Sequence, residues 1–374
     1  MKWAEEFWVP EGGPYLLSHS VGCLMRDAST ALERGFLAPW RQRGADAWPE
    51  WLAAIAEFRA ALAALLGGDA AHYCPQTNLS SGLAKVMTAL PPAEAGRNVV
   101  LASEHCFPSM AFVLERAAGY AVRFIAPPKE PEAALESWRR ALAAPDVRAA
   151  LITHVHYGTG VAAPAAQIAA ECRRRGIVSI LDVAQSAGIL EIDVEAIGAD
   201  VVLGSCVKWL CGGPGAGFLW VRPALIDSLT PADVGWFSHE DPFEFDPHHF
   251  RYATDARRFW GGTPSVAPFV TAAAAVRRLT EIGIEAVRGH NLGLQRLLAE
   301  RIGRHWSFTG PETVRGGTCC IPTGARLARV RAALDERRVR FDQRADILRL
   351  SFHLYNDEAD AIAVAEAFDA AAET

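Results

Sequence analysis

The sequence predicts an α/β fold, with a large domain built on a largely parallel sheet and a smaller α+β domain after it. Between about residues 98 and 221, short apolar segments alternate with helical segments, which is the pattern of strands joined by crossover helices. The apolar segments are continuous runs, as expected for strands that are covered on both faces. The length of 374 residues also favours more than one domain.

A helix is predicted before the alternating segments. Residues 49–67 place apolar side chains at helical spacing, including Ile55, Phe58 and Leu62, and Gly67-Gly68 ends the pattern. The predicted strands then comprise residues 98–102, 121–125, 149–154, 177–182, 201–204 and 217–221. The predicted helices between them comprise residues 109–118, 131–143 and 164–175. Active residues are expected at the carboxyl ends of such strands.

A long helical stretch over residues 265–302 is predicted to connect the two domains. The chain after it is predicted to form a strand around Cys319-Cys320-Ile321, a helix over 324–337, a strand over 348–352 and a helix over 357–371. We therefore expect three parts: an N-terminal segment (1–47) that packs with the small domain, a large domain (48–275) and a C-terminal small domain (276–374).

The composition argues against several classes of partner. A net charge of −6 and a pI near 6.0 argue against nucleic acid as the main partner. No uninterrupted apolar stretch is long enough to cross a bilayer, and the first six residues lack the form of a signal peptide. The eight cysteines show no metal-binding spacing. We therefore expect a cytoplasmic protein with free thiols, without a metal site and without a membrane or nucleic-acid partner.

Lys208 and Asp182 form the most informative pair in the chain. Lys208 follows an apolar strand and precedes the glycine-rich run 211–217, so burial is expected to favour its neutral amine. Asp182 ends another apolar strand, where a carboxylate needs a partner. Pyridoxal phosphate chemistry uses such a pair, because the amine forms a Schiff base with the cofactor aldehyde and the carboxylate keeps the pyridine nitrogen protonated. Both residues are predicted to be catalytic.

Further positions suit the same cofactor. Asn78, Leu79 and Ser80 lie where a helix begins and can offer N–H groups to its phosphate, although ordinary helix capping uses the same residue types. Phe107 follows a strand and can stack on the pyridine ring or pack in the core. Gln185 lies three residues after Asp182 and can donate to the phenolic oxygen of the cofactor or remain an exposed turn amide.

Arg349 and His156 are candidates for substrate binding. Arg349 lies inside an apolar strand, where a guanidinium needs a carboxylate partner. That partner is either the α-carboxylate of an amino-acid substrate or a structural Asp or Glu. His156 shares a strand face with His154, but no third ligand lies nearby, so we expect no metal. His156 is predicted to line a pocket or to be a hydrogen-bonded histidine without a role in the site.

Together these motifs resemble the class V branch of fold-type I pyridoxal phosphate enzymes, and within it the kynureninases most closely. The resemblance spans nearly the whole chain, from Ser18-His19-Ser20-Val21-Gly22 to His353-Leu354-Tyr355-Asn356. Residues 235–243 resemble the family's Gly-Trp-Trp-Gly-His segment, 258–264 its Gly-Thr-Pro loop, and 104–108 the segment that carries the ring-stacking aromatic. The resemblance implies an aspartate aminotransferase-like fold, in which a mostly parallel seven-stranded sheet forms the large domain that binds pyridoxal phosphate.

The resemblance also implies how the site is completed. Trp236 and Thr263 would reach the phosphate of the neighbouring subunit, which implies a homodimer with shared active sites. His19 would bind the substrate together with Arg349, and Ser205 would bind the cofactor. Up to the α-carbanion formed from the external aldimine, all class V enzymes share one path, with the freed Lys208 as the general base.

Three positions depart from the kynureninase pattern. Val207 stands where kynureninases carry a tyrosine, Gln185 where they carry a histidine, and Met110 where they carry an aspartate. Gln185 and Ser205 resemble the cysteine desulfurase and class V aminotransferase pattern. The predicted reaction is kynureninase-like hydrolysis of the Cβ–Cγ bond of an α-amino acid. The alternatives are a class V aminotransferase, a cysteine desulfurase or C–S lyase, and an epimerase.

Two further classes can be weighed against these reactions. A non-catalytic scaffold with the same fold is disfavoured, because Lys208, Asp182 and Arg349 are all retained. A nucleotide-binding α/β protein is disfavoured, because no Gly-x-Gly-x-x-Gly follows the first strand and there is no phosphate-loop lysine motif.

Overall fold

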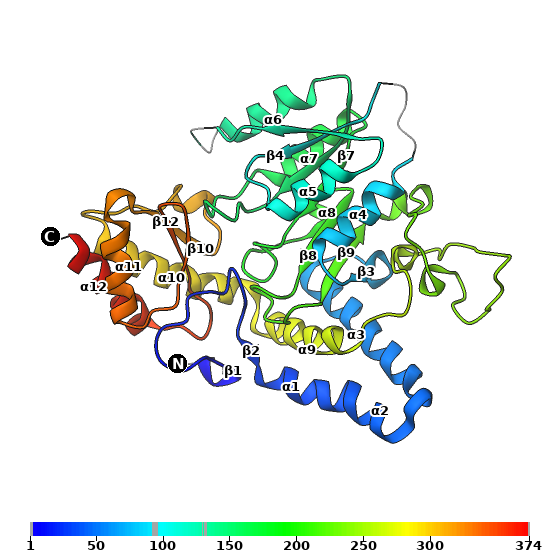
Figure 1. Ribbon diagram of the computed structural model, residues 1–374, viewed down its shortest axis with the longest axis horizontal. Coiled ribbons are helices and arrows are strands. Elements are labelled where there is room, and N and C mark those ends of the chain that lie inside the picture. The colour runs from blue at the N-terminus through cyan, green and yellow to red at the C-terminus, as the bar shows by residue number, and fades with distance from the viewer. Residues whose placement is uncertain (1–2, 92–95, 129, 131–132, 373–374) are drawn as a thin grey trace.

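The computed structural model describes residues 3–91, 96–128, 130 and 133–372. Its centre is a seven-stranded sheet with the order β3-β9-β8-β7-β6-β4-β5 (Figure 1). Strands β5, β4, β6, β7 and β8 pair in parallel, and β9 runs opposite to its neighbours β8 and β3. The strand bounds are β3 Tyr73–Gln76, β4 Val99–Ser103, β5 Ala121–Ile125, β6 Val147–Thr153, β7 Val178–Asp182, β8 Val201–Ser205 and β9 Gly217–Val221. The predicted α/β architecture is confirmed.

Two apolar cores cover the two faces of this sheet. Alternating residues along one strand enter different cores, so Leu181 packs on one face and Ile180 on the other. Helices α4 and α5 cover the face that contains Ile180, and α3, α6, α7 and α9 cover the opposite face. Their bounds are α3 Trp48–Leu66, α4 Leu79–Ala89, α5 Pro108–Arg116, α6 Ala134–Leu142, α7 Ala165–Arg174 and α9 Ala267–Ile282, and the short α8 spans Val194–Ile197. Burial on both faces explains the continuous apolar runs.

A smaller unit follows the sheet and has its own apolar core. Its antiparallel sheet has the order β10-β12-β11 and packs against helices α10, α11 and α12 (Figure 1). The bounds are α10 Ile284–Ile302, β10 Thr318–Pro322, α11 Leu327–Glu336, β11 Asp342–Arg344, β12 Ile347–Ser351 and α12 Glu358–Ala372. Cys319 and Cys320 lie in β10, as the sequence predicts.

The N-terminal segment packs against both units. Leu16 joins the core of the small unit, while Phe7 and Met25 join the main core. The elements of this segment are β1 Phe7–Trp8, β2 Leu24–Met25, α1 Arg26–Leu32 and α2 Ala38–Arg43. Gly22 lies against the turn that carries Lys208, because its N–H donates to the carbonyl of Val207 at 2.8 Å. The division of the chain at residues 47 and 275 remains a prediction.

Several local predictions need correction. The predicted helix over 265–302 is two helices, α9 and α10, because Gly283 adopts a φ of +88° that breaks the helical path. Strand β3 is absent from the predicted strands, since its four residues include a proline and are too short to show a pattern. Of the helix predicted over 131–143, residues 131–132 lie outside the described part of the chain, and α6 begins at Ala134.

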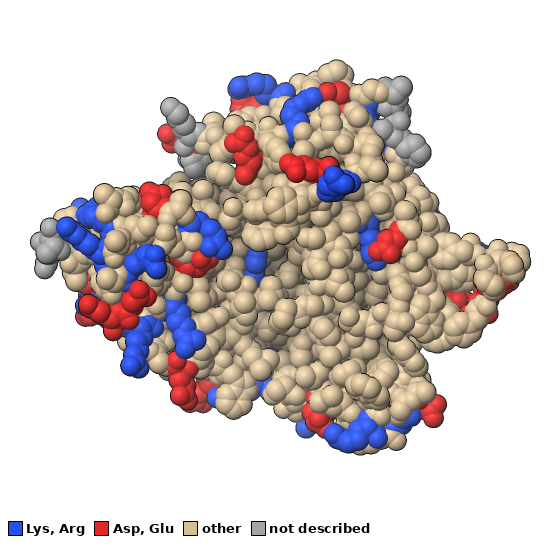
Figure 2. Space-filling view, in the orientation of Figure 1, with Lys and Arg blue, Asp and Glu red and all other residues tan. Residues whose placement is uncertain are grey.

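Charged side chains are distributed unevenly on the face shown in Figure 2. They lie mainly over the small unit and around the rim, and the middle of this face is mostly uncharged. This view therefore offers no broad basic patch of the kind that binds nucleic acid. Among the described helices, none combines the length and the apolar character that a membrane crossing requires.

The contact of Gly22 with the Lys208 turn generates a stability prediction. A Cβ atom at Gly22 would lie 2.2 Å from the backbone oxygen of Lys208 and 2.7 Å from Cys211 Sγ. Gly22→Ala should therefore lower the free energy of unfolding by about 1–3 kcal/mol, which is typical of overpacking. Urea unfolding of the two proteins measures this difference. Gly289→Ala in α10 is the control, since nothing lies within 4 Å of its Cβ position and no loss is expected. An unchanged midpoint for Gly22→Ala would contradict the close packing.

Candidate active site

A cavity of about 460 Å³ opens at the carboxyl ends of β6, β7 and β8, next to the start of α4. Its position agrees with the expected location of a site in a largely parallel sheet. All the predicted cofactor-binding residues except Trp236 and Thr263 line it. The lining comprises Asn78, Leu79, Ser80, Phe107, Ser109, Met110, Thr153, Val155, Tyr157, Asp182, Ala184, Gln185, Ser205 and Lys208.

Lys208 lies in the turn after β8 and supplies the amine of this cavity. Its Nζ atom lies 5.6 Å from the ring centroid of Phe107. Burial lowers the pKa of the Lys208 amine, the Asp182 carboxylate opposes this shift, and the Arg349 charge adds to it. A larger share of neutral amine results, and a neutral amine is the form that attacks an aldehyde.

Asp182 is the carboxylate of the cavity and the last residue of β7. Its side chain is 5% exposed, and Oδ1 accepts a hydrogen bond from the backbone N–H of Ala184 at 2.8 Å. Burial raises the pKa of the Asp182 carboxyl, while the Ala184 N–H and Lys208 lower it. A carboxylate so poorly solvated is stabilised by a cationic partner, such as a protonated pyridine nitrogen.

The other lining residues suit the remaining parts of pyridoxal phosphate. Asn78 caps α4, because its side chain accepts from the N–H of Ser81 at 2.9 Å, and Leu79 and Ser80 of the first turn face the cavity. A helix start of this kind favours a phosphate. Phe107 is 43% exposed, so a face of its ring is free to stack on an aromatic ligand. The residues present therefore fit the cofactor.

Gln185 is anchored by the N-terminal segment and by the turn after β8. Its Nε2 donates to the carbonyl of His19 at 3.0 Å, and its Oε1 accepts from Trp209 Nε1 at 3.3 Å. One N–H of the amide remains for the cavity, because an amide nitrogen carries two. Ser205 ends β8 and also faces the cavity.

Arg349 and His19 lie next to each other outside the cavity lining. Arg349, in β12, is 3% exposed and pairs with Asp342, and its Nη1 donates to the carbonyl of Tyr157 at 2.6 Å. The structure thus supplies a carboxylate partner for Arg349 within the chain. His19 Nδ1 lies 2.5 Å from Ser351 Oγ, and its Nε2 lies 3.5 Å from Asp342.

His156 is placed away from the cavity. Thr153, Val155 and Tyr157 line the cavity, while the ring of His156 contacts His105, with Nδ1 atoms 3.4 Å apart. Burial lowers the pKa of His156 to about 4. The sequence reasoning missed Thr153, Val155 and Tyr157 as lining residues, although their spacing of two in an extended segment could have revealed them.

Two other pairs of predicted residues also lie outside the cavity. Trp236 and Thr263 contact each other outside the Lys208 cavity, with Trp236 Nε1 donating to Thr263 Oγ1 at 3.3 Å. Cys319 and Cys320 are buried in β10, where burial raises the pKa of both thiols. Within the described residues, no three His, Cys, Asp or Glu side chains are grouped to hold a metal ion.

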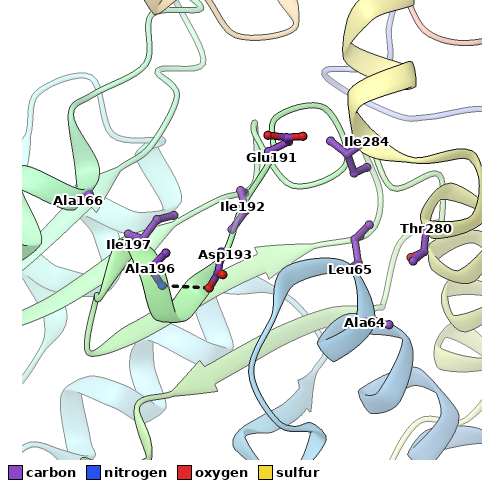
Figure 3. A pocket seen from close by; sticks show the side chains of 10 residues that line it. All are labelled: Ala64, Leu65, Ala166, Glu191, Ile192, Asp193, Ala196, Ile197, Thr280 and Ile284. Carbon is purple, nitrogen blue, oxygen red and sulfur yellow. Dashed lines mark hydrogen bonds between the residues drawn. The ribbon is translucent and has the colours of Figure 1, made fainter.

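A second hollow, of about 570 Å³, lies between α3, α8 and the junction of α9 with α10 (Figure 3). Its walls are mostly aliphatic, and its two charged groups are Glu191 and Asp193. Asp193 is already engaged, because its carboxylate accepts the N–H groups of Glu195 and Ala196 at the start of α8. No lysine that the structure describes lines this hollow, so the amine that the candidate chemistry requires belongs to the Lys208 cavity.

The fold and this cavity define a fold-type I pyridoxal phosphate enzyme. The sequence pattern described as Aminotransferase class-V matches residues 50–364 of the chain. The chain therefore belongs to the class V aminotransferase family and depends on pyridoxal phosphate. One solved structure with a similar fold is a mutant of the cystine C–S lyase C-DES, in which glycine is covalently linked to the PLP cofactor. Its TM-score is 0.84 at 21% identity, over 96% of this chain and 100% of that chain.

Curated relatives carry different activities. The chain is 32% identical to a kynureninase from Deinococcus radiodurans over 77% of its length and 71% of the relative's length. It is 30% identical to an isopenicillin N epimerase from Streptomyces clavuligerus over 83% of both chains. A cysteine desulfurase from Thermococcus onnurineus NA1 shares the fold with a TM-score of 0.81 at 20% identity, over 95% of this chain and 93% of that chain.

Replacing Lys208 should remove the covalent link to the cofactor. Lys208→Ala, saturated with pyridoxal phosphate, is expected to lose the visible absorbance that borohydride bleaches in the wild type, because no amine remains beside the cofactor aldehyde. Absorbance spectra before and after reduction measure this loss. Lys85→Arg is the control, since Lys85 is bound to the carbonyl of Phe259 at 3.0 Å and does not line the cavity. A persistent band in Lys208→Ala would place the link on another amine.

Asp182 should make the cofactor-free protein sensitive to pH. Burial raises the pKa of this carboxyl in the folded state, so its ionisation costs stability once the pH rises above the unfolded value. Cofactor-free Asp182→Asn should therefore melt at a higher temperature than cofactor-free wild type at neutral pH. The difference should vanish at pH values below the ordinary carboxyl range.

Calorimetry of both proteins across this pH range tests the sign of the effect. With saturating pyridoxal phosphate, wild type should melt at a higher temperature than Asp182→Asn at neutral pH, because asparagine carries no charge to pair with a pyridinium nitrogen. A cofactor-free variant that is less stable than wild type at neutral pH would show that the carboxylate is not strained by burial.

Proposed function

We propose that this pyridoxal phosphate-dependent enzyme removes the α-proton of an amino acid and then hydrolyses its Cβ–Cγ bond, as kynureninases do. The observation that carries the proposal is one cavity that is lined by Lys208, Asp182 and Tyr157. The bound cofactor supplies an electron-accepting ring that makes the α-proton acidic. Asp182 keeps the ring nitrogen protonated, and the freed amine of Lys208 accepts the α-proton.

Arg349 and His19 are proposed to hold the α-carboxylate of the substrate. Arg349 is a buried cation and His19 is a buried N–H donor, and both lie beside Asp342. The backbone of Tyr157 connects them to the cavity, since its carbonyl accepts from Arg349 while the residue lines the cavity. A guanidinium held in this way binds a carboxylate with a fixed orientation.

Hydrolysis of a Cβ–Cγ bond requires a proton donor near the leaving group. Position 207 is a valine, so the phenol of Tyr157 is proposed as this donor. The ring of Tyr157 meets that of Phe107 edge-on, with centroids 5.4 Å apart, which places it beside the proposed stacking residue of the cofactor. The identity of 32% to a kynureninase supports this reaction.

Epimerisation is the second candidate. It delivers a proton to the opposite face of the α-carbon without breaking another bond, so it does not require a cleavage donor at position 207. The valine at this position and the similarity to an isopenicillin N epimerase over 83% of the chain favour it. Transamination remains an alternative. A persulfide on Cys319 or Cys320 is not supported, because both thiols are buried outside the cavity.

The enzyme is further proposed to act as a homodimer, with Trp236 and Thr263 facing the partner's cofactor. The ring centroids of Phe243 and Phe245 lie 5.7 and 6.0 Å from that of Trp236. The two phenylalanines are 48% and 72% exposed. Exposed aromatic groups of this kind favour a protein partner. A cytoplasmic location, without nucleic acid or membrane, stays a prediction of the composition.

A substrate panel separates the candidate reactions. Holoenzyme incubated with kynurenine or 3-hydroxykynurenine is expected to form alanine together with anthranilate or its hydroxylated form. Cysteine and a set of keto acids complete the panel, with sulfide and amino-group exchange as their readouts. Inverted stereochemistry without anthranilate would favour epimerisation, and amino-group exchange without anthranilate would favour transamination.

Tyr157→Phe tests the proton donor. The variant should keep the exchange of the α-proton with deuterated water, because Lys208 is intact. It should lose anthranilate formation by a factor of about 10²–10⁴, the usual contribution of a general acid. Tyr120→Phe, which lies outside the cavity lining, is the control. Equal loss of exchange and cleavage would contradict the assigned role.

A further inference from the structure

Asp342 is the carboxylate that faces Arg349 across the small sheet. The two residues are direct partners in the antiparallel pair of β11 and β12. One carboxylate oxygen of Asp342 binds the backbone N–H of Gln343 at 2.6 Å and Nη1 of Arg344 at 2.8 Å. The other oxygen contacts Arg349 Nη2 and lies 3.5 Å from His19 Nε2. Asp342 therefore has one oxygen committed to its own hairpin and one to Arg349 and His19.

The guanidinium of Arg349 is held from both ends and keeps a free donor. Asp342 binds Nη2, and the carbonyl of Tyr157 binds Nη1. The Nε atom is buried and has no hydrogen-bond partner among the described residues. A buried N–H without a partner is costly, so an acceptor is expected to complete it when the site is in use.

His19 lies beside the same carboxylate and directs its Nε2 towards it at 3.5 Å. Its Nδ1 is bound to Ser351, and its Nε2 is buried without a hydrogen bond among the described residues. Burial lowers the pKa of His19 to about 4, so the ring is neutral at physiological pH. Nε2 can then carry the ring proton and donate it, if Ser351 donates to Nδ1.

We propose that Asp342 is a positioning residue, which holds Arg349 through Nη2 and faces Nε2 of His19, so that the free Nε–H of Arg349 receives the α-carboxylate of the substrate. The proposal rests on the proposed function, in which Arg349 binds that carboxylate. Arg349 lies beside the cavity, because Tyr157 lines the cavity and its carbonyl accepts a hydrogen bond from Arg349. The Arg349 charge also reaches the Lys208 amine, whose pKa it lowers.

A comparison of two amines tests this role in the holoenzyme. L-Alanine and ethylamine both bring an amino group to the cofactor, and only alanine brings a carboxylate. Titration of the visible absorbance measures a dissociation constant for each. The wild type is expected to prefer alanine, and Asp342→Asn should reduce this preference by roughly tenfold or more, the range of a charge-assisted hydrogen bond. General damage to the site would weaken the binding of both amines equally and leave the ratio of their dissociation constants unchanged.

Three further variants keep the outcomes distinct. Asp346→Asn, an exposed carboxylate of the same hairpin, should leave the preference unchanged. Asp342→Glu should restore part of it if Asp342→Asn folds poorly, because the charge is kept. Arg349→Gln should abolish it. The proposal is overturned if Asp342→Asn keeps or raises the preference while Arg349→Gln loses it. A wild type that binds both amines equally would overturn the role of Arg349 itself, and the proposal with it.

Discussion

The site depends on one constraint, which is the burial of an amine and a carboxylate at the ends of two adjacent strands. Lys208 and Asp182 each lose solvation in the cavity, and burial shifts the pKa of each group towards its neutral form. Each group also opposes the shift of the other, so neither is as costly as it would be alone. The neighbouring strands β7 and β8 provide this arrangement, since they are parallel and direct both chain ends to one edge.

The C-terminal unit and the N-terminal segment complete the same site from the other side. The carbonyl of His19 binds Gln185, and Gly22 packs on the Lys208 turn, so residues far apart in the chain hold two parts of the cavity lining. Arg349 reaches the cavity through the backbone of Tyr157. The amine proposed to perform the chemistry and the guanidinium proposed to orient the substrate therefore belong to different units, and the Tyr157 carbonyl connects Arg349 to the cavity.

Much of the fold could be predicted because burial on two faces leaves a simple pattern. The β4, β7 and β8 strands were recognisable as continuous apolar runs, and Gly67 marks the end of α3 as expected. The errors occurred where the pattern is short or where one residue changes the path. Strand β3 has four residues including a proline, and Gly283 divides one predicted helix into two.

Local sequence context was enough to predict the pyridoxal phosphate chemistry. Lys208 follows one apolar strand and Asp182 ends another, and charged side chains are unusual at positions so close to a core. Most of the positions predicted to bind the phosphate or to stack on the ring line the cavity, and their roles stay predictions. The three-dimensional arrangement was needed to learn that His156 turns to His105 while Tyr157 lines the cavity, and that Asp342 is the partner of Arg349. Alternate spacing shows which residues of an extended segment share a face, but it does not show which face meets the cavity or which strands pair.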